Sequence, residues 1–338
     1  MIIDCHGHYT TAPDELGQYR EQKQAELERD PLHQAIMGKV GITDDQIRES
    51  LEGAQLKAQR ERGTDLTIFS PRASWMGHHI GNESTSRYWT EHCNELIYRI
   101  TELYPDNFVG VAQLPQSPGV APTACIAEMD RCVNEFGFIG VNLNPDPSGG
   151  YWTDPPLGER FWYPVYEKMC ELDIPAMIHV SAACNPCFHT TGSHYLGADT
   201  TAFMQMITSD IFTDFPDIKF IIPHGGGAVP YHWGRFRGLV QMMSDKASLE
   251  ELVLGNVFFD TCVYHQAGID LLLDVIPAEN ILFASEMLGA VRGIDPLTDH
   301  YFDDTRRYID ANTGVDAQDK EKIFTTNARR VFKRLNVD

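Results

Sequence analysis

Residues 2–8, with the sequence IIDCHGH, place two histidines directly after a short apolar run. The run Ile2–Cys5 is typical of a strand in a parallel sheet that is covered on both faces. His6 and His8 are two positions apart, and side chains at that spacing on a strand point the same way. They can therefore converge on one ion, and the stretch predicts a metal site at the carboxyl end of a first strand.

Similar short runs recur along the chain and alternate with longer segments of helical pattern. This alternation is typical of repeated βα units and a parallel sheet. Eight such runs predict a TIM (β/α)₈ barrel of the α/β class, formed by residues 1–338 as a single domain. The expected strands are Ile2–Cys5, Leu66–Ser70, Phe108–Gln113, Ile139–Asn142, Ala176–Val180, Ile218–Pro223, Val257–Thr261 and Ile281–Ala284.

The segments between the runs predict helices and long loops. The stretches 144–156 and 181–197 are rich in Pro, Gly and Ser and are expected to be loops. The long polar insertion Tyr9–Ile42 is expected to form a small cap over the barrel mouth. Helices are expected at Asp44–Arg62, Ser86–Tyr104, Pro122–Glu135, Glu159–Leu172, Thr200–Phe215, Asp304–Asn312 and Ala317–Leu335.

The charge of the chain excludes nucleic acid as a general partner. There are 27 basic and 48 acidic residues, and the resulting net charge of −21 repels a phosphate backbone. An anionic substrate would need local arginines. No basic segment precedes an apolar run near residue 1, and no stretch reaches 18 apolar residues. We therefore expect a cytoplasmic protein without membrane contact.

The eight cysteines are scattered rather than spaced as a disulfide framework, and we expect free thiols. Cys184 and Cys187 form a CxxC pair. The pair lacks the matching second pair of a zinc ribbon. It is either two small loop residues or part of a functional loop.

Polar residues fall where the predicted strands end, and active sites of such barrels lie at the carboxyl ends of the strands. Three imidazoles and a carboxylate leave an open position of the kind that catalytic zinc uses, with manganese as the alternative. His224 lies in IIPHGGG and is interpreted as an acid or base, as a substrate contact, or as packing against the glycine turn. The residues at the strand ends are His6, His8, Arg72, His179, His224 and Glu286.

Five motifs carry a resemblance to a known family. They are DCHGH, PAMIHVS, FPDIKFIIPHGGGAVPYHWGRFR, NVFFDT and ILFASEM. Together they resemble the amidohydrolase superfamily, in the branch of aminocarboxymuconate semialdehyde decarboxylase, over nearly the whole chain. The branch usually has a Ser-Asp pair after strand eight, whereas this chain has Ser285 and Glu286.

That longer carboxylate, with SPRASWMGHH and LNPDPSGGYWTDPP after strands two and four, resembles the 4-oxalomesaconate hydratases more closely. This resemblance implies a hydro-lyase of protocatechuate 4,5-cleavage, in the catabolism of lignin-derived aromatic compounds. The substrate would be the small-molecule tricarboxylate 4-oxalomesaconate or its keto tautomer, and the product 4-carboxy-4-hydroxy-2-oxoadipate. We also expect a homo-oligomer.

The resemblance assigns roles to matching residues. It makes His6, His8 and His179 the zinc ligands, and Glu286 a further ligand or the base that activates a zinc-bound water. The water would attack the conjugated double bond, and Cys187 or His224 would protonate the adjacent carbon. Arginine grips carboxylates in a bidentate manner, although most arginines form surface ion pairs. The expected substrate-binding residues are Arg72, Ser74, Tyr195, Arg235 and Arg292.

Three other functions fit the same pattern. A nonoxidative decarboxylase of a related aromatic-derived acid would use the same metal, and carbon dioxide release would identify it. A lactonase would direct activated water at a carbonyl group instead of an alkene. A barrel that binds a ligand without turnover would contain no metal.

Overall fold

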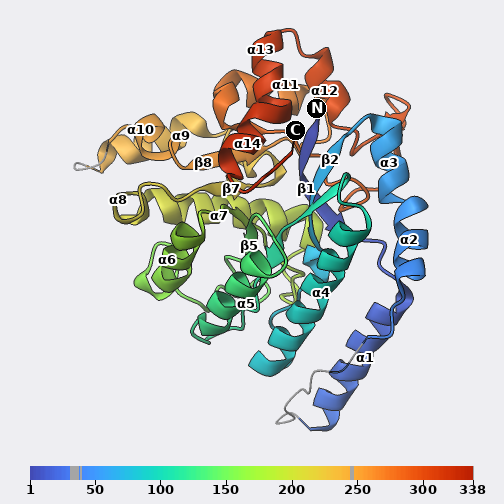
Figure 1. The fold of residues 1–338 in the computed structure, drawn as a ribbon. Coiled ribbons are helices and arrows are strands. Elements are labelled where there is room, and N and C mark those ends of the chain that lie inside the picture. Colours follow the sequence, from blue (N-terminus) through green and yellow to red (C-terminus); the bar gives the residue numbers. More distant parts are fainter. Residues whose placement is uncertain (31–37, 39, 244–246, 338) are drawn as a thin grey trace.

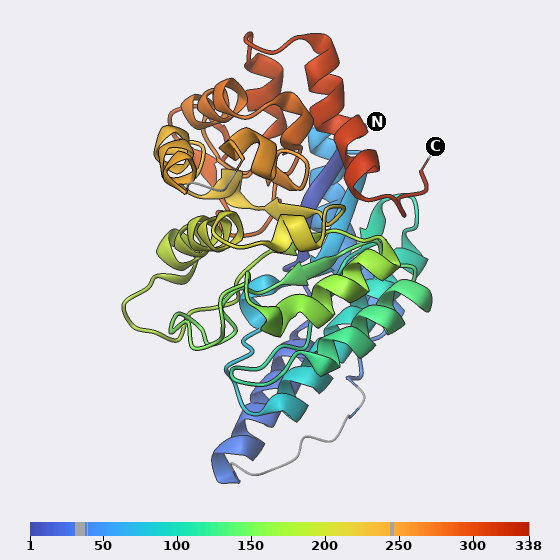
Figure 2. The same ribbon diagram turned by 90° about the vertical axis from the view of Figure 1, so that its left-hand side faces the viewer.

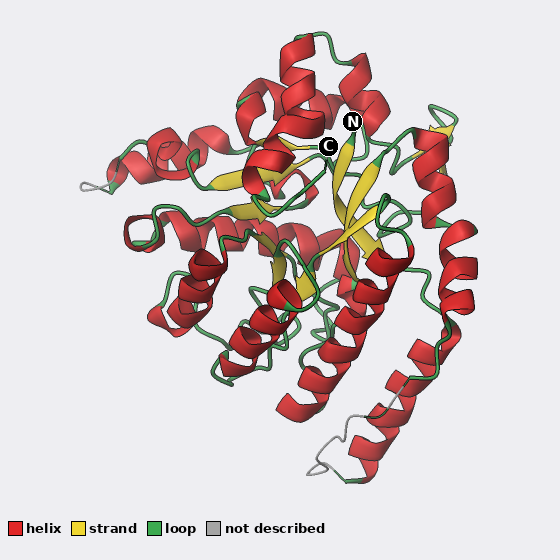
Figure 3. Ribbon diagram, viewed as in Figure 1, coloured by secondary structure: helices red, strands yellow, loops and turns green. Residues whose placement is uncertain are grey.

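The strands form a parallel barrel, as the sequence predicted. The computed structural model describes residues 1–30, 38, 40–243 and 247–337. The predicted third strand is split in two at Val111, so nine short strands fill the eight positions (Figures 1 and 3). They are β1 Ile3–Tyr9, β2 Leu66–Pro71, β3 Phe108–Gly110, β4 Ala112–Gln113, β5 Val141–Leu143, β6 Ala176–Ile178, β7 Phe220–Ile222, β8 Val257–Asp260 and β9 Ile281–Leu282.

Backbone hydrogen bonds close this ring of strands. Strands β1 to β3 pair in order, as do β4 to β9, and every pairing is parallel. Val111 donates to the Phe69 carbonyl at 2.9 Å and joins the two sheets at one side. Cys5 donates to the Phe283 carbonyl at 2.9 Å and joins β1 to the segment after β9. The barrel is therefore closed, and the carboxyl ends of all its strands face one mouth.

Strand β1 extends beyond the predicted Ile2–Cys5 to Tyr9, so both histidines lie within the strand. Its pairing with β2 shifts register between Asp4 and Gly7. A Cβ atom at Gly7 would lie 2.3 Å from the Thr67 side chain, so only glycine fits at this close approach.

Helices cover the outside of the barrel, and both termini lie at the same end (Figures 1 and 2). The larger ones are α1 Asp14–Arg29, α2 Asp44–Glu52, α3 Gln55–Arg62, α4 Glu83–Leu103, α5 Thr123–Asn134, α6 Tyr163–Leu172, α7 Tyr195–Ile207, α9 Trp233–Met242 and α11 Gln266–Val275. The shorter ones are α8 Ile211–Asp214, α10 Leu249–Val253, α12 Arg306–Ala311, α13 Ala317–Glu321 and α14 Asn327–Val331.

Local backbone geometry accounts for where prediction and structure differ. The predicted helix Asp44–Arg62 is interrupted at Gly53 and Ala54, since Ala54 has a non-helical φ of −135° and ψ of −94°. The predicted loop 181–197 contains a π-helical turn, Thr190–His194, that leads directly into α7. Tyr195 is therefore the buried first residue of α7 and not a loop residue.

The insertion after β1 contains α1, which lies beside α4 at the edge of the molecule (Figures 1 and 2). The Tyr19 ring lies nearly parallel to the Trp89 ring, with 6.4 Å between their centroids. Residues 31–37 and 39 of the predicted cap lie outside the described residues. A two-stranded hairpin that was not predicted, β10 Ile294–Asp295 with β11 His300–Tyr301, follows β9.

The strands pack their outward side chains against the surrounding helices in one large core. Phe220, Phe259 and Phe203 of α7 are among its fully buried members. A smaller cluster fills the barrel interior below the mouth and includes Ile3, Met177 and Phe332. Among the described residues, no helix is long and apolar enough to cross a membrane.

Candidate metal centre

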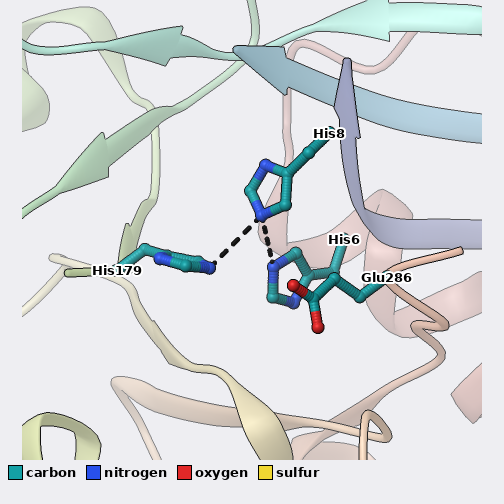
Figure 4. Close-up of side chains that lie close together, drawn as sticks. All are labelled: His6, His8, His179 and Glu286. Atoms are coloured by element: carbon teal, nitrogen blue, oxygen red, sulfur yellow. Dashed lines mark hydrogen bonds between the residues drawn. The ribbon is translucent and has the colours of Figure 1, made fainter. Parts of the chain in front are cut away.

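Four buried side chains meet at the mouth of the barrel (Figure 4). His6 and His8 belong to β1, while His179 follows β6 and Glu286 follows β9. Their possible ligand atoms lie within 4.8 Å of one another. The His8 Nε2 atom is 2.9 Å from the His6 Nε2 atom and 3.2 Å from the His179 Nε2 atom. The structure thus brings together the residues expected to bind metal.

Two of the imidazoles are oriented by acceptors behind them. The His6 Nδ1 atom lies 2.7 Å from Oδ2 of Asp260, and the His179 Nδ1 atom lies 2.8 Å from the Val180 carbonyl oxygen. A carboxylate and a carbonyl only accept, so both Nδ1 atoms carry the proton. The Nε2 atoms of the neutral rings then present lone pairs.

His8 is oriented in the same way by Ser70. The Ser70 hydroxyl donates its proton toward two backbone carbonyl oxygens. The Gly7 oxygen lies at 3.2 Å and the Pro71 oxygen at 3.3 Å. The hydroxyl therefore accepts from the His8 Nδ1 atom, at 2.7 Å. The Nε2 atom of His8 also presents a lone pair toward the other two rings.

Three converging lone pairs repel each other unless a cation lies between them. Two nitrogens bound about 2.1 Å from one ion are roughly 3.0–3.4 Å apart for ligand angles near 90–110°. The observed separations of 2.9 and 3.2 Å are close to that range. The donor set, three imidazoles and one carboxylate, therefore fits a divalent metal ion such as zinc or manganese.

Burial keeps the rings of His8 and His179 neutral. It lowers the pKa of His8 and of His179 well below the ordinary value, and the neighbouring imidazoles lower both further. A metal-binding imidazole must be unprotonated at the ligating nitrogen, so the environment favours the ligating form.

Glu286 is placed by an unusual backbone conformation. Its φ of 48° lies in the left-handed region, which few residues other than glycine adopt. Its backbone N–H donates to the His6 carbonyl at 3.0 Å, and the Tyr264 hydroxyl donates to Oε2 at 2.6 Å. A Cβ atom at Gly289 would lie 2.7 Å from the Glu286 Cγ atom, so glycine leaves room for the carboxylate.

Asp260, at the end of β8, links the ligands to the strand beside them. Its Oδ1 atom accepts from the backbone N–H of Gly225 at 2.8 Å and of Cys262 at 3.1 Å, while Oδ2 faces His6. Burial alone raises the pKa of this carboxyl, but the hydrogen bond from His6, the charge of His224 and the backbone N–H of Gly225 outweigh burial and lower it. Asp260 is therefore ionised and orients His6.

Asp4 connects β1 to the segment after β9 beneath the site. Its Oδ1 atom accepts from the backbone N–H groups of His6 and Ser285, each at 3.1 Å, and the Ser285 hydroxyl donates to Oδ2. Complete burial raises the pKa of Asp4 to about 6. Asp4 thereby holds β1 against the residue that precedes Glu286.

His224 lies beside the four residues with one ring nitrogen available. Its Nδ1 atom is 2.9 Å from Oδ2 of Asp199, and its ring centroid is 5.1 Å from that of His179. The Nε2 atom is buried and has no hydrogen-bond partner among the described residues. Burial lowers the pKa of His224, but the charge and hydrogen bond of Asp199 outweigh it and raise the pKa to about 9. His224 can therefore carry a proton on Nε2.

Positive charge and hydroxyl groups frame the mouth. Arg72 donates from Nε to the Ser74 hydroxyl at 2.9 Å, and its guanidinium lies 4.7 Å from the Trp75 ring centroid. Burial and the nearby charge of Arg292 lower the pKa of Arg72. The buried Tyr195 ring lies 5.0 Å from the His179 ring. Of the five expected substrate-binding residues, Tyr195 therefore lies beside the centre, Arg72 and Ser74 contact each other after β2, and Arg292 is exposed near Arg72.

The structure does not gather Arg235 and Cys187 with these buried residues. Arg235 is exposed on α9. Cys187 is exposed in the loop after β6, where its backbone N–H bonds to the Asn185 side chain. All eight cysteines are free, as expected.

Several residues of the site were missed because single positions carried little signal. Asp260 ends the apolar run VFFD, and Asp4 follows the apolar pair Ile2 and Ile3. A charged residue in a strand that is expected to be buried was the signal that could have indicated both positions. Tyr264 and Asp199 come from a loop and a helix, where tyrosine and aspartate are common.

Comparison with known proteins places the chain in a family. The profile of the family described as Amidohydrolase matches residues 3–334. The chain belongs to the amidohydrolase family. Within it, the chain is 59% identical over 336 residues to 2-keto-4-carboxy-3-hexenedioate hydratase from Sphingobium sp., covering 99% of this chain and 97% of that protein.

Solved structures of the family agree with the barrel. The crystal structure of 4-oxalomesaconate hydratase from Rhodopseudomonas palustris superposes with a TM-score of 0.90, at 58% identity, over 99% of this chain and 96% of the other. The manganese-bound 5-carboxyvanillate decarboxylase from Novosphingobium aromaticivorans gives 0.70 at 19% identity, over 98% and 97%. The latter similarity concerns the fold alone.

Proposed function

We propose that this protein is a hydro-lyase that adds water to 4-oxalomesaconate or its keto tautomer, 2-keto-4-carboxy-3-hexenedioate. The product is 4-carboxy-4-hydroxy-2-oxoadipate. The observation that carries the proposal is the 59% identity to a hydratase over 99% of the chain. The departure from the decarboxylase pattern at Glu286, where the branch usually has aspartate, supports the same reaction.

The metal of this reaction is zinc in our proposal, held by His6, His8, His179 and Glu286. The converging Nε2 atoms and the buried carboxylate support this donor set. When bound, a divalent ion supplies a Lewis acid that makes a water molecule acidic near neutral pH. Manganese suits the same ligands, and the manganese bound by a distant relative keeps it as the alternative.

The carboxylate of Glu286 accepts a proton from the attacking water. Its Oε2 atom is already held by the Tyr264 hydroxyl at 2.6 Å, so the group is oriented before substrate arrives. The hydroxyl adds to C4 of the keto tautomer, and the electron pair of the C3–C4 double bond moves through C2 onto the 2-oxo oxygen. An enolate results, which needs a proton at C3.

His224 is the acid that supplies this proton. Its Nδ1 atom is anchored to Asp199, its Nε2 atom has no other partner among the described residues, and its raised pKa of about 9 favours the protonated form. Cys187 is the second candidate, and its exposed position requires its loop to move inward. The guanidinium of Arg72 and that of Arg292 bind the substrate carboxylates, and Ser74 and Tyr195 contribute hydroxyl groups.

The test is a direct assay of the metal-loaded protein with 2-keto-4-carboxy-3-hexenedioate. We expect the absorbance of the conjugated chromophore to disappear while a tertiary alcohol forms, detected by mass as the gain of one water. Removal of metal by a chelator should abolish turnover, and zinc should restore it at least as well as manganese. Release of carbon dioxide without gain of water would instead identify a decarboxylase.

A further inference from the structure

A cavity lies between α1, α4 and the segment that follows β2, outside the metal centre. It contains about 470 Å³ of space not filled by protein atoms, part of which is open to solvent. Figures 1 and 2 show α1 beside α4 along this edge. Its walls are mainly apolar and aromatic, and include Tyr19, Met76, Ile80, Tyr88 and Trp89. None of these residues has a part in the proposed hydration.

One cation that has no counter-charge among the described residues faces this cavity. The Arg20 guanidinium carbon lies 5.5 Å from the Trp89 ring centroid, and Arg20 has no hydrogen bond or ion pair with any other residue that the structure describes. In a chain of net charge −21, a partly buried arginine without a carboxylate partner is unusual. Burial lowers the pKa of Arg20, because its charged form lacks a compensating group.

The other polar groups of the cavity leave this charge uncompensated. Lys23 is paired with Glu26 at 2.9 Å, so it adds no free charge. His78 is buried, and burial lowers its pKa to about 3, so its ring is neutral. The cavity thus offers a single guanidinium fork beside aromatic rings, which suits one carboxylate attached to one flat ring.

We propose that this cavity is a second small-molecule site, which binds an aromatic monocarboxylate through Arg20. The ring packs against Trp89 and Tyr19, and the carboxylate accepts from the guanidinium. Trp89 donates from Nε1 to the Trp75 carbonyl at 2.9 Å, and Arg72 stacks on Trp75. The ligand therefore contacts the segment that frames the barrel mouth, without entering the metal centre.

Calorimetric titration of the metal-loaded protein with benzoate tests this site. We expect one molecule bound per chain, with benzamide and acetate at least tenfold weaker, because each lacks either the charge or the ring. The variant Arg20→Gln should lose at least tenfold in benzoate affinity while its thermal unfolding and basal turnover stay unchanged. Lys23→Gln is the matched control, since it removes an ion-paired charge from the same wall, and should bind benzoate within twofold of the unaltered protein.

A further variant separates this cavity from the metal centre, which also attracts carboxylates. Arg72→Ala removes a carboxylate-binding group from the barrel mouth. It should leave the benzoate affinity of the cavity within twofold of that of the unaltered protein. Benzoate binding that is lost in Arg72→Ala but kept in Arg20→Gln would overturn the proposal, because the ligand would then occupy the mouth. Equal affinity for benzoate and benzamide, or an absence of benzoate binding, would overturn it as well.

Discussion

Two regions near the barrel mouth, one with three buried imidazoles and one with a single buried imidazole, use the same side chain in opposite ways. At the metal centre, the Nε2 lone pairs of His6, His8 and His179 face one another. In the segment after β2, the His78 Nδ1 atom lies 3.1 Å from the Ser86 hydroxyl and its Nε2 atom 3.3 Å from the Gln113 amide. The three Nε2 lone pairs of the metal centre need a cation between them, whereas both ring nitrogens of His78 already have hydrogen-bond partners as a neutral ring.

This difference shows that burial and histidine content do not by themselves make a metal site. His8 and His78 are 3% and 2% exposed, and the pKa of each is lowered by burial first. The two rings differ in what their Nε2 lone pair faces: other imidazoles for His8, and the Gln113 amide for His78. In each ring the hydroxyl that accepts from Nδ1 fixes the direction of that lone pair. The predictions below change residues of these two regions one at a time.

The largest effect is expected from Glu286→Gln, which removes the charge from the carboxylate that completes the metal centre. Turnover should fall by about three orders of magnitude or more, because an amide cannot accept the proton of the attacking water. Steady-state kinetics measure this loss, and circular dichroism checks that the fold persists. Turnover within tenfold of the unaltered enzyme would remove Glu286 from the role of base.

A smaller loss is expected from Asp260→Asn, which weakens the orientation of His6. Metal affinity should fall by about 10- to 100-fold, as is usual when the partner behind a ligating histidine is lost. Titration against a competing chelator measures this change. Ser86→Ala is the matched control, because it removes the partner of His78 and should leave metal affinity unchanged. Equal losses in the two variants would abolish the distinction between the two regions.

The fold was predictable because its signal is repeated, whereas much of the site depends on single positions. Eight apolar runs that alternate with segments of helical pattern predicted the barrel even though the third run is broken at Val111. His6 and His8 were found because two histidines at a strand spacing form a pattern. Tyr264 gave no such pattern, since its contact with Glu286 depends on left-handed backbone at both residues, with φ of 63° and 48°. Such conformations are imposed by tertiary packing rather than by local sequence.

Arg72→Ala tests the residue that joins the two regions, because Arg72 begins the segment that leads to His78. We expect KM to rise by roughly 10- to 100-fold with a smaller change in kcat, since a charge-assisted contact to a substrate carboxylate is lost. Arg48→Ala, which removes the same charge from the exposed surface of α2, should leave KM within twofold. An unchanged KM in Arg72→Ala would contradict its role in carboxylate binding.

The smallest effect concerns His78 and acid stability. Its pKa is about 3 in the folded protein because the ring is buried, compared with 6.5 ordinarily. Below pH 6.5 the unfolded chain binds a proton that the folded protein excludes, so stability falls as the pH falls toward 3. This contribution is roughly 1 kcal/mol per pH unit, and His78→Gln should not show it. Urea unfolding at pH 7, 6 and 5 measures the difference between the two proteins, which cancels the contribution that His8 and His179 make to both. A His78→Gln curve that runs parallel to that of the unaltered protein would mean that His78 is protonated in the fold.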